Sequence, residues 1–201
     1  MSPEKNLPFA FELLKEFAQA HPEQAVVYDL IGSGSAAYEA KLHSLSAKLP
    51  STIQVNFIGQ LSPEALQTRL QPSGLSSQVS GLPPSPSAPP PQVSSLTPQV
   101  SGLSYHALLM PSLTENFSYT VLESLQAGIP VLISDQTPWR DLEAQGIGWD
   151  LSLENREPWL VVLSSIHNAS EGQQQLFSES CRRFVCDWIQ LTKTALYSLF
   201  K

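Results

Sequence analysis

Two glutamates near the middle of the chain could do chemistry together. Glu115 lies in a polar loop over residues 112–116, and Glu123 follows it in a segment whose apolar positions recur at helical spacing. Paired carboxylates act as acid and base in glycoside hydrolysis when the fold brings them together. Spacing alone does not distinguish such a pair from two surface glutamates. The predicted elements around them are needed to judge whether they form a site.

The stretch from 105 to 142 is predicted to form a strand, a loop, a helix and a second strand. Residues 106–110 are a short apolar run, and the helical spacing that follows continues to Gly128, a residue typical of helix C-terminal ends. Residues 129–133 form the second apolar run. A right-handed β-α-β unit places the loop after its first strand, and hence Glu115, at the carboxyl edge of the sheet, where open α/β folds bind ligands.

The start of this helix, at residues 118–119, predicts an anion site. The free N–H groups of a first helical turn, together with the helix dipole, attract phosphate. Carboxylates beside such a site suit the hydroxyl groups of a sugar better than the phosphate itself. A nucleotide-linked sugar satisfies both halves of this arrangement.

A second candidate is a glycine turn nearer the start of the chain. Gly32 and Gly34 fit the pattern G-x-G-x-x-A between an apolar run at 25–31 and a helical pattern, and such a turn lets backbone N–H groups approach a phosphate. A nicotinamide-dependent dehydrogenase would also need an acidic residue about 20 positions further on, and residues 52–57 contain no carboxylate. A dehydrogenase is therefore disfavoured, and a tight turn without a ligand stays open.

The remaining segments alternate between helical and strand patterns. We expect a helix with Asn6 as its N-cap, a strand at 25–31, a helix stopped by Pro50, a strand at 53–58, a short helix capped by Ser62, an edge strand at 147–151 and terminal helices docked on the core. Nearly continuous apolar strands are typical of parallel sheets that are buried on both faces. The pattern predicts one Rossmann-like α/β domain, a parallel sheet with helices on both faces.

Residues 71–103 interrupt this domain with a heptapeptide repeat rich in Gln, Val, Ser, Gly, Leu and Pro, without a charged residue. Proline and glycine in most copies exclude a continuous coiled-coil helix. Because this composition buries too little apolar area to offset the entropy of ordering, we predict a disordered, polyproline-rich insertion. A ligand for an SH3-like partner is the alternative, disfavoured because no basic residue flanks the prolines. The domain would then consist of residues 1–70 and 104–201.

Net charge and cysteine content indicate which partners and which cellular compartment to expect. The 201 residues carry a net charge of -7 with 11 scattered basic residues, which argues against binding to nucleic acid or to an anionic membrane. Cys181 and Cys186 point in different directions on a helix, so we expect both to be reduced and the protein to be cytoplasmic. No apolar run is long enough to span a membrane and no signal-peptide pattern is present. The protein is expected to be soluble, with peripheral membrane contact left open.

The central motif is part of a longer pattern. Its stretches are 111–125 and 128–131, then 134–142 and 146–149, with Lys5-Asn6-Leu7 and the glycine turn upstream. This pattern resembles the E-x7-E region and its surroundings in family 4 ("group 1") glycosyltransferases of GT-B fold. The similarity covers the chain apart from the repeat, and the central motif is its specific part.

The resemblance implies the C-terminal, donor-binding half of a retaining glycosyltransferase that needs no metal ion or other cofactor. Glu123 would hold the ribose hydroxyls, Glu115 would contact the donor sugar near the reacting centre, and Lys5 would neutralise the diphosphate leaving group. The further donor-binding residues that it implies are Asn116, Phe117 and Ser118 for sugar hydroxyls, Thr120 and Val121 for the diphosphate, and Gly32 and Gly34. The family usually has glycine where Ser118 stands.

The resemblance also implies partners. The donor would be a UDP- or GDP-linked sugar, and a separate N-terminal GT-B domain would supply the acceptor site. We expect sugar transfer when the two halves are paired. The alternative is a non-catalytic remnant of glycosyltransferase origin, or an interaction module that uses the proline-rich loop.

Overall fold

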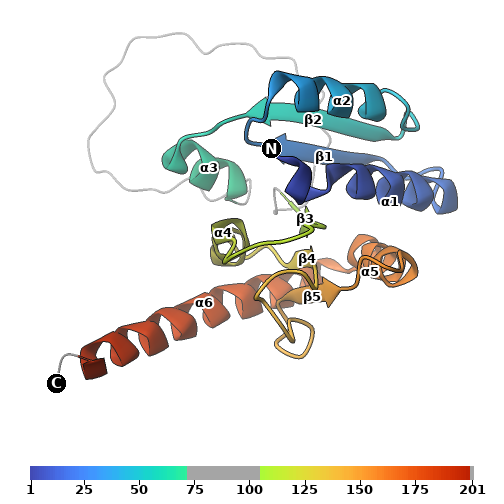
Figure 1. The fold of residues 1–201 in the computed structure, drawn as a ribbon. Helices are drawn as coiled ribbons and strands as arrows, with labels where there is room; N and C mark the ends of the chain where they lie inside the picture. The colour runs from blue at the N-terminus through green and yellow to red at the C-terminus, as the bar shows by residue number, and fades with distance from the viewer. Residues whose placement is uncertain (72–104, 200–201) are drawn as a thin grey trace, which may run out of the picture.

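The computed structural model describes residues 1–71 and 105–199, and the repeat predicted over 71–103 lies, apart from Gln71, outside them. The elements are the 3-10 helix η1 (Pro3–Lys5), α1 (Leu7–Ala20), β1 (Val26–Ile31), α2 (Ala36–Ser46), β2 (Ile53–Gly59), α3 (Pro63–Leu70), β3 (Leu108–Met110), α4 (Tyr119–Ala127), β4 (Val131–Ser134), β5 (Gly148–Leu151), α5 (Glu157–Asn168) and α6 (Glu171–Leu199) (Figure 1).

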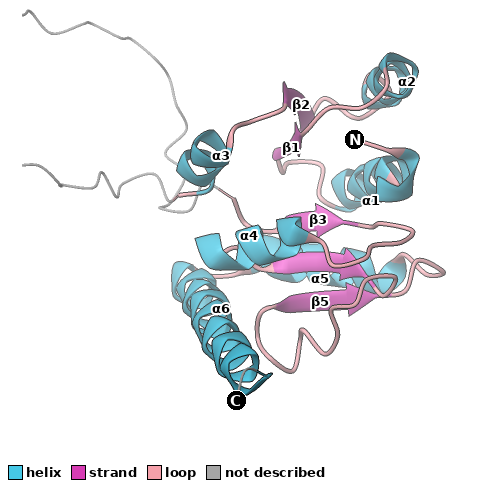
Figure 2. Ribbon diagram, turned by 60° about the vertical axis from the view of Figure 1, so that its left-hand side comes forward, coloured by secondary structure: helices cyan, strands magenta, loops and turns pink. Residues whose placement is uncertain are grey.

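The strands form two parallel sheets, of order β1-β2 and β3-β4-β5. Helix α1 packs against α2 and α5, whereas α4 packs against α3 and α6, so helices cover both faces (Figure 2). The predicted α/β fold with parallel strands between two helical layers is confirmed, and β5 lies at the edge as expected. The prediction of one continuous sheet differs from the structure, because no strand pairing joins β1 to β3 among the described residues.

The cap predicted at Ser62 is confirmed, because its side chain accepts a hydrogen bond from the Ala65 N–H at 3.2 Å. Asn6 stands at the predicted N-cap position of α1, but its side chain caps nothing. The reason is η1, which the sequence did not predict. Asn6 ends η1 with a left-handed φ of 50° and donates its N–H to the Pro3 carbonyl at 3.0 Å.

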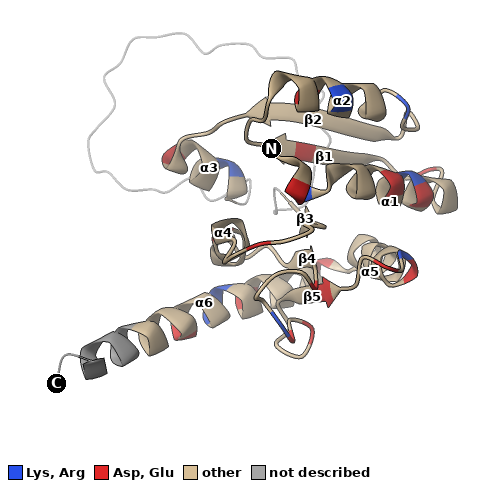
Figure 3. Cartoon of the chain, viewed as in Figure 1, with Lys and Arg blue, Asp and Glu red and all other residues tan. Residues whose placement is uncertain are grey.

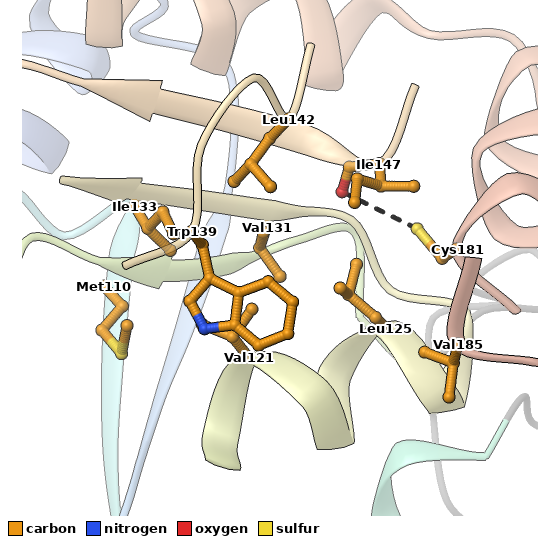
Figure 4. Packing of buried hydrophobic residues seen from close by; sticks show 10 residues of the cluster. All are labelled: Met110, Val121, Leu125, Val131, Ile133, Trp139, Leu142, Ile147, Cys181 and Val185. Carbon is orange, nitrogen blue, oxygen red and sulfur yellow. Dashed lines mark hydrogen bonds between the residues drawn. The ribbon is translucent and has the colours of Figure 1, made fainter. Parts of the chain in front are cut away.

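The larger core cluster lies between the three-stranded sheet and the pair α4 and α6 (Figure 4). Val121 and Leu125 of α4 are fully buried there against Val131 and Ile133 of β4. Helix α6 adds Cys181, whose burial raises the pKa of the thiol to about 12. The prediction that α6 docks on the core is confirmed, and Cys181 and Cys186 are free in the structure. Among the described residues, no helix is both long and apolar enough to cross a bilayer.

A polar cluster ties the two ends of the interrupted segment to β1. Arg69, in the last turn of α3, and Tyr105, where the described chain resumes, both donate hydrogen bonds to Oδ2 of Asp29 at 2.6 Å. Asn56 of β2 donates to the other carboxylate oxygen at 2.7 Å. The Asp29 side chain is 6% exposed. Burial by itself raises its pKa, but hydrogen bonds from Tyr105, Arg69 and Asn56 outweigh burial and hold the pKa of Asp29 below its ordinary value of 3.8.

We predict that Tyr105→Phe lowers the free energy of unfolding by about 2 kcal/mol at neutral pH, because a buried carboxylate loses a donor. Since the folded-state pKa of Asp29 is lowered, its stabilisation is complete above the unfolded-state pKa and is lost as the pH falls through the folded-state value. The difference between variant and parent, measured by urea unfolding, should therefore shrink in acid. The exposed Tyr119 provides the control variant Tyr119→Phe, which should leave stability unchanged; a Tyr105→Phe deficit that is constant down to pH 2 would contradict the assignment.

Candidate functional site

The first turn of the chain and the loop after β3 meet at an ion pair. The Lys5 ammonium contacts Oε1 of Glu115, although the two residues are 110 positions apart. The Lys5 side chain is 36% exposed and that of Glu115 is 12% exposed. The two residues that the sequence assigned to the reacting centre are thus brought together by the fold.

Hydrogen bonds fix the loop that carries Glu115. The Ser112 hydroxyl donates to the same carboxylate oxygen at 2.9 Å, and the Glu115 N–H donates to the Gln136 carbonyl at 3.2 Å. The Leu113 N–H donates to the Glu4 carbonyl at 2.7 Å, which attaches the loop to η1. The carboxylate is therefore held by a cation, a hydroxyl and its own backbone rather than swinging freely.

A cavity of about 530 Å³ opens beside this pair. Lys5, Gly32, Thr120 and Glu123 are among the residues that line it, and the part of the cavity beside them is here called its polar end. The other lining residues include Asp29 and Tyr105 and come mainly from β1, α3, β3 and α4. Four of the ten predicted site residues thus share one cavity. Glu115 does not line the cavity itself, but it contacts Lys5, which does.

The amino end of α4 faces this region without a side-chain cap. Its N-cap residue Ser118 has a left-handed φ of 60°, a conformation that costs a residue with a Cβ about 1–2 kcal/mol. The Val121 side chain is buried in the core, and its N–H donates to the Ser118 carbonyl at 3.1 Å. The first turn of α4 lacks a side-chain cap, and binding of a diphosphate by Thr120 and Val121 stays a prediction.

Asn116 and Phe117 precede that helix. Asn116 is exposed. Phe117 packs with the rings of Tyr119, Trp139 and Trp188 at centroid distances of 5.1, 5.4 and 6.0 Å. The Phe117 carbonyl accepts a hydrogen bond from Nε1 of Trp139 at 2.5 Å. In this structure Phe117 is an anchor of the loop, and its predicted contact with a sugar stays a prediction.

The glycine turn is occupied by the chain itself. The Gly32 N–H donates to the Gly59 carbonyl, and the Gly34 N–H donates to Oε1 of Glu39, both at 2.7 Å. Met1 packs so closely on Gly34 that an added Cβ would collide with the Met1 backbone. The close approach that needs glycine at position 34 is therefore made here by Met1. Binding of a phosphate by Gly32 and Gly34 stays a prediction.

Sequence reasoning missed three contributors, Ser112, Glu39 and η1. Ser112 lies three residues before Glu115 in a loop, a spacing at which a hydroxyl commonly bonds to a nearby acid, and that was an available signal.

Lysine and arginine residues are spread over separate elements (Figure 3). Within the described residues, no three His, Cys, Asp or Glu side chains are placed to hold a metal ion.

No protein-family model and no curated protein matches the chain. The structure resembles WaaG, a glycosyltransferase involved in lipopolysaccharide biosynthesis, with a TM-score of 0.56 and 14% identity over 90% of this chain and 39% of WaaG.

Two further solved structures resemble the chain. HepE of Anabaena, in complex with UDP-glucose, has a TM-score of 0.59 at 12% identity over 99% of this chain and 46% of HepE. Sucrose-phosphate synthase of Thermosynechococcus elongatus has a TM-score of 0.59 at 14% identity over 99% of this chain and 43% of the synthase. Identities this low show a shared fold, and the chain spans less than half the length of each of the three proteins.

We predict that Ser118→Gly raises the free energy of unfolding by about 1 kcal/mol, because glycine adopts the left-handed conformation without a steric penalty. The control Ser118→Ala keeps the Cβ and loses only the 3.4 Å contact of the hydroxyl with Sδ of Met110, so it should not stabilise. Denaturant unfolding of the two variants gives the comparison. A Ser118→Gly protein no more stable than Ser118→Ala would show that residue 118 carries no such strain.

Proposed function

We propose that this chain, which has the fold of one domain of a GT-B glycosyltransferase, binds a nucleotide-linked sugar as the donor half of a retaining glycosyltransferase. The donor would lie at the polar end of the cavity, with its diphosphate between Lys5 and the amino end of α4. The ribose hydroxyls would meet Glu123, and the sugar would lie beside the loop that carries Glu115. The complex of HepE with UDP-glucose supports a UDP-linked donor for this chain.

One observation carries the proposal. Lys5, Glu123 and Thr120 line one cavity, and Lys5 also contacts Glu115. A cation beside an uncapped helix end attracts phosphate, whereas a carboxylate further along the same helix, here Glu123 of α4, accepts hydrogen bonds from hydroxyls. The arrangement therefore fits a ligand with an anionic middle and neutral polyol groups on either side.

The chain's own groups suggest how transfer would be assisted. When the bond between the sugar and the diphosphate breaks, negative charge grows on the leaving oxygen. A fixed ammonium and the dipole of α4 would stabilise that charge without reorganisation. Because Glu115, itself held by a hydrogen bond from Ser112, pairs with the Lys5 ammonium, Lys5 is placed before the donor arrives. No metal ion or other cofactor is required in this scheme.

The acceptor site belongs to a different surface in this proposal. We expect a second GT-B domain, supplied by another part of the protein or by another chain, to close over the cavity and to present the acceptor oxygen. The setting would be the cytoplasm, where nucleotide-linked sugars and reduced cysteines both occur.

We predict that UDP and UDP-glucose bind to the full chain in calorimetric titration, and that Glu123→Ala weakens both by about tenfold through loss of the ribose contact. Lys5→Met should weaken UDP by about tenfold or more and leave uridine, which has no phosphate, unchanged. The exposed Glu143 gives the matched control, since Glu143→Ala removes a carboxylate away from the cavity and should leave the affinity unchanged.

Circular dichroism of each variant separates lost binding from lost folding. GDP and GDP-mannose, titrated in parallel, report the preference for the base. Absence of binding of both nucleotides at millimolar concentration, by a chain shown to be folded, would contradict the proposal.

A non-catalytic remnant is the second candidate, and a specific observation favours it. Lys5 is already paired with Glu115, and the amides of Gly32 and Gly34 are already hydrogen-bonded within the chain. A site that has lost its ligand would show such internal satisfaction. If the double variant Glu115→Ala with Glu123→Ala retains the chain's cellular role, that role does not depend on the two carboxylates and the remnant is favoured.

A further inference from the structure

Helix α3 has no buried residue, although it forms part of the cavity wall. Leu66 and Leu70 lie four positions apart on one face of this helix, and both are half-buried and line the cavity. The hydrophobic core clusters within the described residues contain no member of α3. Apolar packing therefore contributes little to the position of this helix, and a different interaction must hold it.

The Asp29–Arg69–Tyr105 cluster supplies that interaction at the carboxyl end of α3. Arg69, in the last turn of the helix, donates from Nη2 to Asp29 and from Nε to the Tyr105 hydroxyl, both at 2.6 Å. The planar guanidinium suits such a contact with two partners at once. The amino end of α3 follows β2 after residues 60–62. The helix is thus fixed by the chain at one end and by Arg69 at the other.

Each group of this cluster keeps one role at neutral pH. Asp29 accepts hydrogen bonds from Arg69, Tyr105 and Asn56. Burial and the hydrogen bond to Asp29 raise the pKa of Tyr105 to about 12, so its hydroxyl remains a donor. The guanidinium of Arg69 stays charged. A carboxylate on β1 therefore determines where α3 lies.

The proposed donor site places the base of the nucleotide against this helix. The diphosphate would lie at the amino end of α4 near Thr120, and the ribose at Glu123, about one turn further along the same helix. The base then extends from the ribose away from the phosphates. Helix α3 packs against α4 (Figure 2), and its Leu66 and Leu70 offer the cavity an apolar surface that suits the flat face of a base.

We propose that Asp29 is a positioning residue for the base of the nucleotide, because through Arg69 and Tyr105 it holds α3 as the wall against which the base lies. This inference rests on the proposed function and adds residues that contact neither the phosphates nor the sugar. Asp29 and Tyr105 also line the cavity, whereas Arg69 is not among its described lining residues. A substitution at Arg69 therefore separates positioning of α3 from direct contact with the ligand.

Calorimetric titration of the full chain with uridine, UDP and inorganic pyrophosphate tests this role. We expect Arg69→Met to weaken uridine and UDP by about tenfold each and to leave pyrophosphate unchanged, because pyrophosphate meets only Lys5 and the amino end of α4. Lys5→Met should give the opposite pattern, with uridine unchanged. The exposed Arg183 of α6 provides the matched control, since Arg183→Met should leave all three affinities unchanged.

A double-mutant cycle tests whether Asp29 acts through Arg69. If both belong to one cluster, the chain with Asp29→Asn and Arg69→Met should bind uridine no more weakly than the weaker single variant, whereas independent effects would multiply to about a hundredfold. Arg69→Lys keeps the charge without the planar fork and should recover only part of the affinity. Circular dichroism checks that each variant is folded, and Arg69→Met decides alone if Asp29→Asn does not fold.

The outcomes distinguish this inference from the proposed function. If the parent chain binds neither UDP nor uridine at millimolar concentration, the proposed function fails and the base site fails with it. If the parent binds both, and a folded Arg69→Met protein binds uridine as tightly as the parent, the inference alone is overturned. An equal loss of pyrophosphate and UDP affinity in Arg69→Met, or multiplying effects in the double variant, would also overturn it.

Discussion

The burial of α1 is the constraint on which the rest of the structure depends, because no strand pairing within residues 1–71 and 105–199 joins the two sheets. One side of this helix packs Leu7 and Phe11 with Leu30 of β1. Another side of the helix places Leu13 against Leu132 of β4. Side-chain packing on α1 therefore joins the two sheets, a role that backbone hydrogen bonds have in a continuous sheet. It also fixes η1, and with it Lys5, at the edge where the loop after β3 ends.

This constraint explains both the cavity and its chemistry. The cavity between β1 and β3 is lined by Leu7 of α1 on one face and by Leu66 of α3 and Thr120 of α4 on the other, and it is open to solvent. Its polar end collects Lys5 from the first turn and Glu123 from α4, residues that are far apart in the sequence. Glu115 is then held by Lys5 and Ser112. The arrangement combines η1, the loop after β3 and α4, so the central motif alone cannot form it.

Local patterns predicted the elements well because each one carries its own signal. Gly128 ends α4 with a φ of 83°, and the Ser62 cap and the apolar run of β4 are equally local. The resemblance predicted that Lys5 and Glu115 belong to one site, and the structure brings them together, although their roles remain untested. Periodicity did not predict the break between β1 and β3, because register and pairing between distant strands leave no trace in a short window. The Asp29–Arg69–Tyr105 cluster was missed for the same reason, since its members lie on β1, α3 and the segment before β3.

The proposed donor site at the polar end of the cavity should bind a nucleotide-linked sugar. Amide chemical shifts of the full chain, recorded by NMR during titration with UDP-glucose, test this claim most directly. We expect the largest changes at Lys5, Tyr119, Thr120 and Glu123, and no change at residues of α6 such as Glu179. Changes confined to the opposite edge of the sheet, near His21 and His167, or no change at saturating ligand, would contradict it.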